Sequence, residues 1–417
     1  IKGIRELKLR ASMGTAGIRP TFDQRFETFE LINGALRKNT LGNNFLSPSH
    51  STEMEIGLDA TLFRAFDLEF NYATVKTEDQ ILLVPITAAA GFTGQWQNAG
   101  TLEAKIYEAN IHADLKKLFK IAVRDFQWGV DVTFDRVEQN ITQLDVPAYN
   151  TGPGIQQSNL FLIEEGIPFG TMVGEVFATS LDQLEDMENV NVSDYTINEV
   201  GYVVRKDAIG TADELPVKVL DANGNPVVQV IGDINPDFRM GFAHTLAFKG
   251  LKLYALVDWK KGGDIYNMTK HWLYRDQRHA DISTYPTVAG GFFGSNGLYN
   301  VLVPNNHFVE DGSFVMLREA SISYTFGQDQ MKNIFGGLIQ SLKISFIGRN
   351  LLTFTDYSGF HPDITSIPRG ENTLSNRVSG AIGSDLYTPY GDPNLFVVDA
   401  FNYPVSKTYS FSLQLTF

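Results

Sequence analysis

Aromatic and hydrogen-bonding side chains gather in two long segments of weak periodicity, 260–312 and 351–406. Flat rings beside polar groups can stack on sugar faces or hold peptide side chains. The same residue types also form membrane girdles and protein interfaces. The residues we expect to contact substrate on this basis are His271, Trp272, Tyr274, Arg275, Phe292, Phe293, Tyr299, Tyr387 and Tyr390.

Metal and catalytic chemistry find little support in the sequence. The 7 histidines are scattered without the paired spacing of metal ligands. Asp221, Asn223 and Asn225 begin like a calcium loop, but Pro226 stands where the sharp-turn Gly belongs, so a plain turn is favoured. There is no Gly-x-Ser-x-Gly elbow of a hydrolase. We therefore expect no bound metal, no cofactor and no enzymatic activity.

The last residues of the chain show what kind of element must position these segments. Apolar and polar residues alternate there without a break, with Tyr409, Phe411, Leu413, Leu415 and Phe417 on one face and Thr408, Ser410, Ser412, Gln414 and Thr416 on the other. A tilted strand of about ten residues spans a bilayer. The stretch predicts the closing strand of an outer-membrane barrel, with a half-buried strand of a soluble sandwich as the alternative.

The rest of the chain repeats this period in about twelve predicted strands. We expect strands at 4–14, ending in a turn at 14–17, and at 55–62, 66–72, 102–113, 126–138, 238–248, 251–259, 313–326, 342–349 and 407–417. The pattern weakens between 139 and 237, where an even number of crossings is needed and two are predicted. Short connections at 63–65, 114–124, 249–250 and 327–340 alternate with long ones. If Phe417 ends on the periplasmic side, the segments 260–312 and 351–406 lie outside the cell.

Composition agrees with a barrel and excludes other classes. A net charge of −14 without a basic cluster argues against nucleic acid as a partner. The sequence contains no cysteine and no apolar run of the roughly 18 residues that a spanning helix needs, so contact with lipid must be through strands. The 30 Phe, 16 Tyr and 37 Gly are typical of strands, girdles and turns. The chain begins at Ile1 rather than Met, so we expect it to be part of a longer polypeptide.

Five motifs carry a specific resemblance. They are Asp233–Phe242 (DINPDFRMGF), Lys260–Asn267 (KKGGDIYN), Phe308–Phe326 (FVEDGSFVMLREASISYTF), Gly348–Asp363 (GRNLLTFTDYSGFHPD) and Tyr403–Phe411 (YPVSKTYSF). In this order they resemble the C-terminal half of the SusC/RagA family, the TonB-dependent outer-membrane transporters of Bacteroidota. Read from the residues alone, the motifs have structural roles. Asn235 and Pro236 start a strand, Gly262, Gly263 and Gly359 permit positive φ, and Arg349 pairs with Asp356 at a rim.

The resemblance implies an all-β, membrane-spanning antiparallel barrel of 22 strands, plugged by an N-terminal domain. Residues 1–417 match its C-terminal portion, so the plug, the TonB box and the earlier strands are expected in another part of the protein. The family imports oligosaccharides across the outer membrane of Gram-negative bacteria, energised by TonB and lidded by a SusD-like surface lipoprotein. An importer of peptides like RagA is the first alternative. A surface adhesion or structural barrel that does not transport is the second. Asp59, Asp67, Glu69 and Asp131 are predicted to form an acidic wall inside the barrel.

Overall fold

The closing stretch forms the strand that its alternation predicts. The computed structural model describes residues 3–32, 34–155, 158–185, 187–188, 190–286, 289–299, 303–336, 338–363, 398–402 and 404–417. In it, β21 (Thr408–Thr416) pairs antiparallel with β20 (Ser341–Phe354), and Phe411 stands opposite Phe346. Because both strands keep the two-residue period, their apolar side chains share one face of the sheet.

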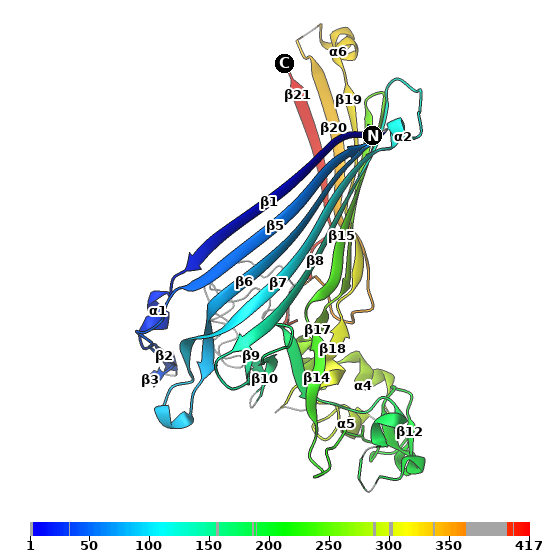
Figure 1. Cartoon of the computed structure of the whole chain (residues 1–417). Coiled ribbons are helices and arrows are strands. Elements are labelled where there is room, and N and C mark those ends of the chain that lie inside the picture. The colour runs from blue at the N-terminus through cyan, green and yellow to red at the C-terminus, as the bar shows by residue number, and fades with distance from the viewer. Residues whose placement is uncertain are drawn as a thin grey trace.

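Strands of this kind make up one curved sheet (Figure 1). It has 11 strands, of which β4 (Thr40–Leu41) pairs in parallel with β7 and the long ones are antiparallel. In spatial order the long strands are β1 (Ile4–Ile18), β5 (Ser49–Leu62), β6 (Phe66–Pro85), β7 (Gly94–Asp114), β8 (Phe126–Leu144), β15 (Pro236–Phe248), β16 (Leu251–Gly262), β19 (Phe314–Phe326), β20 and β21. Each lies beside its neighbour in the chain, as in an up-and-down barrel wall.

The two ends of the sheet differ in their connections. The end that carries both termini has the shorter connections (Figure 1). Two are tight turns, at 63–65 and 249–250, and two are somewhat longer and hold α2 (Leu115–Leu118) and α6 (Gln328–Phe335). Lys249 and Gly250 both have positive φ, 46° and 90°, as a tight two-residue hairpin requires. The long connections all lie at the opposite end. This asymmetry is the one predicted from the sequence.

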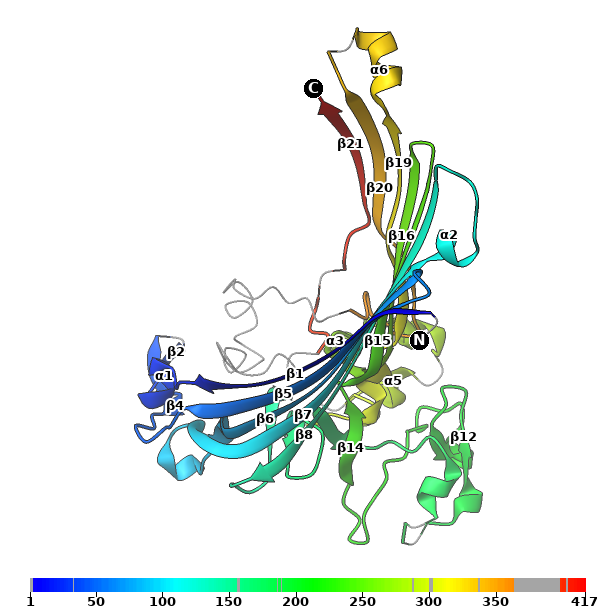
Figure 2. The same ribbon diagram turned by 45° about the horizontal axis from the view of Figure 1, so that its top comes forward.

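The long connections fold into structure of their own beyond the sheet (Figure 2). Their strands are β2 (Phe29–Ile32), β3 (Ala35–Lys38), β9 (Tyr149–Ile155), β10 (Ser158–Ile163), β11 (Thr171–Glu175), β12 (Tyr195–Ile197), β13 (Val203–Arg205), β14 (Val228–Asp233), β17 (Asp264–Tyr266) and β18 (Val309–Asp311), and their helices are α1 (Phe22–Arg25), α3 (Met268–Arg275), α4 (Ala280–Thr284) and α5 (Ala289–Phe292). Strands β14, β11, β10 and β9 form a 4-stranded sheet. Across the described ranges, no helix combines the length and apolar character needed to cross a membrane.

Two expectations about this architecture are wrong. The segment 139–237 contributes no crossing, because β8 pairs directly with β15. Of the strands between them, β9, β10, β11 and β14 form the 4-stranded loop sheet and β12 pairs with β13. The parity was right, since zero is even, and the long strands are correspondingly fewer than twelve. Residues 14–17 are not a turn either. They continue β1 to Ile18 and pair with β5, where Gly14 stands opposite Glu53.

Candidate functional site: the lumen-facing wall beneath the loops

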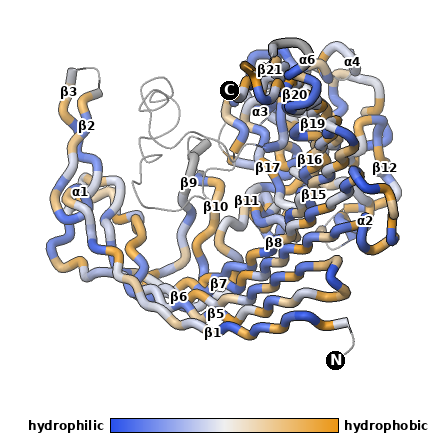
Figure 3. The backbone as a smooth tube through the Cα atoms, turned by 90° about the horizontal axis from the view of Figure 1, so that it is seen from above, coloured by the Kyte–Doolittle hydropathy of each residue, from blue (hydrophilic) through white to orange (hydrophobic). Residues whose placement is uncertain are grey.

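The concave face of the sheet is the polar one. Leu102 of β7 and Ile141 of β8 pack against Ile163 of β10, and β10 lies within the curve of the sheet when the molecule is seen from above (Figure 3). Side chains that share a face with Leu102 therefore line the inside. Two-residue steps along β7 bring Asn110 and His112 to this face.

The convex face is apolar across the whole sheet. One row of directly opposed residues crosses six strands from β8 to β21: Trp128, Leu246, Leu253, Ile322, Phe346 and Phe411. On β8 the outward residues stay apolar from Phe126 to Phe134 and then become charged at Arg136 and Glu138. Tyr72 and Tyr107, with ring centroids 5.1 Å apart, mark the same boundary on β6 and β7. An apolar band edged by aromatic and charged residues is the outer surface of a membrane barrel.

The predicted acidic wall exists on the inside, but most of its carboxylates are partnered. Arg10 of β1 bonds to Asp59, with Nη2 to Oδ1 at 2.8 Å, and reaches Glu69 at 3.0 Å. Asp131 accepts or shares a proton with His112 Nδ1 at 2.5 Å. Asp59, Asp67 and Glu69 line an open hollow near the end that carries the termini. These groups make a polar, mixed-charge wall.

A second charged cluster lies at the other end of the wall, directly below the loops. Arg239 of β15 bonds to Asp258 of β16 through two nitrogens, Nη2–Oδ2 at 2.7 Å and Nε–Oδ1 at 3.1 Å. Arg318 donates from Nε to the same Asp258 carboxylate at 2.8 Å and from Nη2 to Asp363. Arg318 is the extra residue of a bulge in β19, since Leu317 and Glu319 pair with consecutive residues of β16. A bulge re-aims one side chain, and here it directs the guanidinium inward.

Motif residues also fix the loops above this cluster. Tyr357 donates its hydroxyl to Asp399 Oδ2 at 2.6 Å, and Asp399 Oδ1 accepts from Thr269 Oγ1 of α3 at 2.9 Å. Glu310 accepts from Ser358 Oγ at 2.7 Å and from Lys270 Nζ at 3.2 Å. These bonds join segments that are far apart in the sequence into one body. Thr269 and Asp399, for example, are 130 residues apart.

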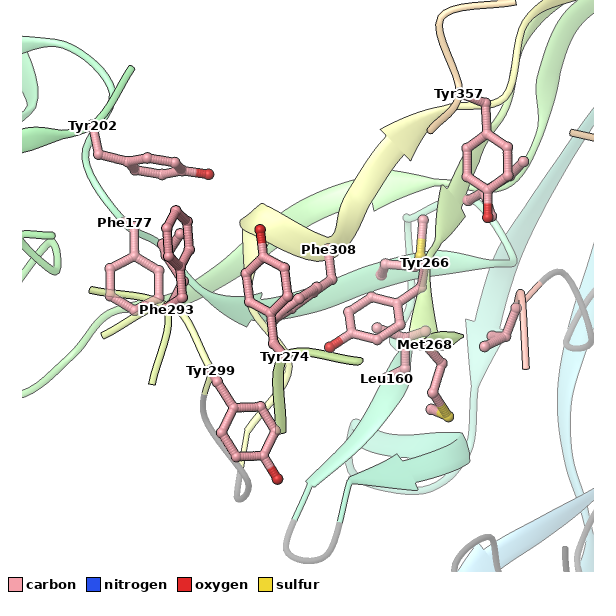
Figure 4. Close-up of a cluster of buried hydrophobic side chains, with 14 of the residues drawn as sticks. Leu160, Phe177, Tyr202, Tyr266, Met268, Tyr274, Phe293, Tyr299, Phe308 and Tyr357 are labelled. Carbon is pink, nitrogen blue, oxygen red and sulfur yellow. The ribbon is translucent and has the colours of Figure 1, made fainter. Parts of the chain in front are cut away.

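Most of the aromatic residues expected to contact substrate lie in the core of this body (Figure 4). His271, Tyr274, Phe292 and Phe293 are 1% exposed or less. Tyr274, Phe292 and Phe293 pack with Phe177, Tyr202, Tyr266 and Phe308 in one cluster, and the His271 ring lies against Tyr266 and Phe308. Because packing already covers both faces of these rings, a ligand would reach them only after the core opened.

The others lie within this core, at its edge or outside the described residues. Trp272 packs against the cluster from its margin, and the Arg275 guanidinium sits 4.0 Å from the centre of the Trp272 ring. Tyr299, at 7% exposed, is a buried member of the cluster and not an edge residue. Tyr387 and Tyr390 fall in 364–397, outside the described ranges.

Buried hydroxyl and imidazole groups connect the core through a hydrogen-bonded chain. Tyr202 OH lies 2.6 Å from His307 Nδ1, His307 Nε2 lies 2.8 Å from Tyr274 OH, and Tyr274 donates to Asp281. Burial holds the pKa of His307 well below its usual range, so this imidazole is neutral. The bond from His279 lowers the pKa of Asp281 to about 2. This series of hydrogen bonds connects Tyr202, just before β13, with α3 and α4.

The weak calcium candidate is a turn. Asp221 Oδ1 accepts from the backbone N–H groups of Asn223 and Asn225, each at 2.9 Å, so its carboxylate caps the bend. These backbone bonds lower the Asp221 pKa. Within the described part of the chain, no group of three or more metal-ligating side chains comes together.

Sequence reasoning did not select the Arg239, Asp258, Arg318 and Asp363 cluster as a site. A signal was available, because three of the four lie inside the quoted motifs and Arg239 and Asp258 hold inward positions in their strands. The proposed pair of Arg349 with Asp356 is wrong, since Arg349 Nε bonds to Glu319 Oε2 at 2.9 Å across the ladder. Gly262 and Gly263 do have positive φ, whereas Gly359 does not.

Comparison with known proteins agrees with this geometry. Residues 4–206 match a family described as TonB dependent receptor-like, beta-barrel. TonB-dependent receptor P3 of Formosa agariphila is 28% identical over 405 residues, which is 93% of this chain and 36% of that protein. TonB-dependent receptor P26 of the same organism is 25% identical over 447 residues, covering 99% of this chain and 40% of that protein. The chain therefore spans well under half the length of these relatives.

A solved structure has the same fold. The RagAB peptide transporter superposes with a TM-score of 0.66 at 19% identity, over 100% of this chain and 41% of that chain. The matched proteins are receptors and a transporter, which confirms the expectation that the chain is not an enzyme. They also confirm the SusC/RagA resemblance and the C-terminal barrel fold.

Proposed function

We propose, from the premise that this chain belongs to the TonB-dependent receptor β-barrel family, that it forms the C-terminal wall of an outer-membrane importer. The observation that carries the proposal is the two-faced sheet. Its convex face is apolar in every long strand, and its concave face is polar and charged. A wall with lipid on one side and water on the other suits passage of a polar solute.

The missing part of the mechanism would come from the rest of the protein. A plug domain, a TonB box and the earlier strands of a 22-stranded barrel would complete the cylinder. TonB would supply the energy through the plug, and a SusD-like lipoprotein would cover the loops from outside. The setting is the outer membrane of a Gram-negative bacterium of the Bacteroidota type.

Oligosaccharide is our first candidate for the imported solute. Trp272 and Arg275 lie at the margin of the loop core, where a ring and a guanidinium can meet a sugar face, and Tyr299 lies in the core behind them. The buried members of the predicted set, His271, Tyr274, Phe292 and Phe293, would support these from behind. Tyr387 and Tyr390 remain part of the proposed binding set.

Peptide is the second candidate. The RagAB structure is that of a peptide transporter, and the wall carries both signs of charge within reach of one another, as at Arg10 and Asp59. A peptide presents both signs along its length. A neutral glycan presents neither, so the charged wall is the specific feature that keeps this candidate open.

Uptake by living cells tests the proposal. The gene for the intact protein is deleted, and accumulation of labelled oligosaccharide mixtures and labelled peptide mixtures is compared with the parent strain and with a strain lacking TonB. We expect the deletion and the TonB loss to abolish uptake of one oligosaccharide fraction alike. Loss of peptide uptake alone would replace the first candidate by the second. Surface binding that survives TonB loss, with no accumulation in any strain, would favour an adhesion barrel instead.

A further inference from the structure

Three cations surround one aromatic ring at the base of the loops. Phe314, the first residue of β19, is 2% exposed. Its ring centre lies 5.4 Å from Arg318 Cζ, 5.6 Å from Lys260 Nζ and 5.9 Å from Arg239 Cζ. All of these side chains project from the concave face. We call Arg239, Lys260, Arg318 and Phe314 the basic socket.

The carboxylates near the basic socket do not satisfy it evenly. Asp258 bonds to both arginines, and Asp363 bonds to Arg318 and lies 3.7 Å from Arg239 Nη2. Asp135 stands opposite Arg239 in the ladder. Each of the two guanidinium groups therefore bonds to at least one carboxylate oxygen. Lys260, the third cation, has no such bond.

Lys260 is buried without an acceptor. The residue is 7% exposed, yet its ammonium forms no hydrogen bond and no ion pair with any of the described residues, and it lies 5.6 Å from the centre of the Phe314 ring. Asp363, Asp311 and Asp264 attract it only through space, Asp363 most strongly, and Arg239 repels it. A buried ammonium is costly unless an anion or several acceptors meet it. The basic socket therefore lacks a negatively charged group within bonding distance of the Lys260 ammonium.

Asp363 shows what such a group looks like when bound. It comes from the extracellular segment after Tyr357, not from the wall, and its carboxylate enters the socket from above. Arg239 leaves a way in, because its side chain is 37% exposed while those of Arg318 and Asp363 are 19% and 14% exposed. Arginine forks are well shaped for carboxylates.

We propose that the basic socket is a carboxylate-binding subsite of the lumen, in which Asp363 occupies the place that a carboxylate of the imported glycan takes, with Lys260 as its added partner. This rests on the proposed import function and narrows its substrate to oligosaccharides that carry acidic sugars. The exchange is non-covalent: the ligand oxygens accept from Lys260 Nζ and Arg318 Nη2, and Asp363 withdraws with its segment into water.

Binding to the intact purified transporter in detergent tests the subsite. The probes are a trimer of galacturonate, its fully methyl-esterified form and a tri-glutamate peptide, with affinities measured by calorimetry. Lys260→Met removes the ammonium and keeps the stem. We expect it to weaken galacturonate binding by at least about tenfold and to leave the ester unchanged, because a charge-assisted bond is lost. Lys261→Met is the matched control, since Lys261 is exposed and pairs with Asp311 at 3.9 Å.

Asp363→Asn separates a subsite from a purely structural clamp. If Asp363 competes with ligand, its removal tightens galacturonate binding by about threefold or more. Equal binding by wild type and K260M, weaker binding by D363N, or no binding of galacturonate would each overturn the proposal. Dependence on Lys260 for tri-glutamate alone would assign the subsite to peptides and overturn the glycan assignment. Binding is measured on the purified protein and does not depend on transport. A failure of the import proposal in the uptake experiment can therefore be distinguished from a failure of the subsite.

Discussion

At the scale of single residues, Tyr274 connects most of the loop core. Its hydroxyl is bonded to His307 Nε2 at 2.8 Å and donates to Asp281, while its ring packs edge-on against Phe293 and Phe308. Removing this hydroxyl takes the partner of His307 Nε2 away and leaves Asp281 with one bond fewer, which costs about 1–3 kcal/mol. Substitution of Tyr274 by phenylalanine keeps the ring and its packing, so its effect reports the hydrogen bonds alone.

We predict that Tyr274→Phe lowers the free energy of opening of the loop core by about 1–3 kcal/mol. Hydrogen–deuterium exchange of α3 and the 303–308 segment in the intact protein measures it. Tyr285→Phe is the control, because the Tyr285 ring lies 6.3 Å from Phe293 but its hydroxyl forms no bond among the described residues. Equal effects of the two substitutions would show that the hydroxyl chain does not hold the core together.

His307 makes the same core sensitive to pH. Its pKa is lowered well below the usual range by burial, with Lys270 nearby as a second cause. An opened segment binds a proton near pH 6.5, whereas the folded one does not. Stability is therefore complete above about pH 6.5 and is lost as the pH falls below that value, by about 1.4 kcal/mol per pH unit. Asp281, with its pKa at about 2, stays ionised through this range.

The expected outcome is faster exchange of the 303–308 amides at about pH 5.5 than at about pH 7.5, after correction for intrinsic rates, by the slope just given. His307→Gln cannot titrate, so its exchange should be less protected at both values and nearly independent of pH. A wild-type core that gains protection in acid would contradict the neutral, buried imidazole.

At the scale of elements, the outer face of β21 decides whether the strand can meet lipid. Leu413 stands opposite Ile344 on the apolar face, and Gln414 stands opposite Lys343 on the polar one. An arginine near the midplane of the lipid-facing surface costs about 2–4 kcal/mol, and on the water-lined side far less.

Leu413→Arg should therefore reduce assembly of the intact protein into the outer membrane, while Gln414→Arg should leave it near the wild-type level. The measure is the heat-modifiable folded fraction in purified outer membranes. The adjacent positions have the same strand context, so propensity effects cancel between them. A larger loss for Gln414→Arg would mean that the two faces have been assigned the wrong way round.

The elements that were predictable and those that were not differ in what surrounds them. Long strands between lipid and water show a clean period of two, so 126–138 and 407–417 were read correctly from sequence. Strand β11 is buried along its whole length, so no period remains to read there. Gly14 and Gly17 suggested a turn because glycine is common there, but β1 pairs straight through them.

The candidate site followed the same logic. Aromatic residues at 271–299 were correctly recognised as gathering in one loop region, but not as buried, because the residues that cover them come from far along the chain. Tyr357 and Val398, for instance, join the cluster from a separate segment. The basic socket escaped notice because its members are single polar positions spread over β15, β16 and β19. Only the pairing of those strands brings them together.

At the scale of the whole molecule, the sheet is open. Strands β1 and β21 are its two end strands and, in the described residues, do not pair with each other; they stand apart at the two ends of the curve (Figure 3). An unpaired edge in lipid leaves backbone groups without partners, at several kcal/mol each. Both edges must then be paired with further strands in the assembled barrel.

Engineered cysteines test this directly, because the chain has none of its own. Phe346 and Phe411 stand opposite each other on adjacent strands, and opposed residues lie about 4.5–5.5 Å apart between Cα atoms, within disulfide range. We predict that F346C/F411C crosslinks in the intact protein under mild oxidation. Leu9→Cys combined with Phe411→Cys joins β1 to β21 and should not crosslink within one molecule. A disulfide in the second pair, seen as a shift on non-reducing gels, would mean that this sheet closes on itself into a small barrel. The lumen would then be too narrow for an oligomeric solute, and both the import proposal and the subsite would fall with it.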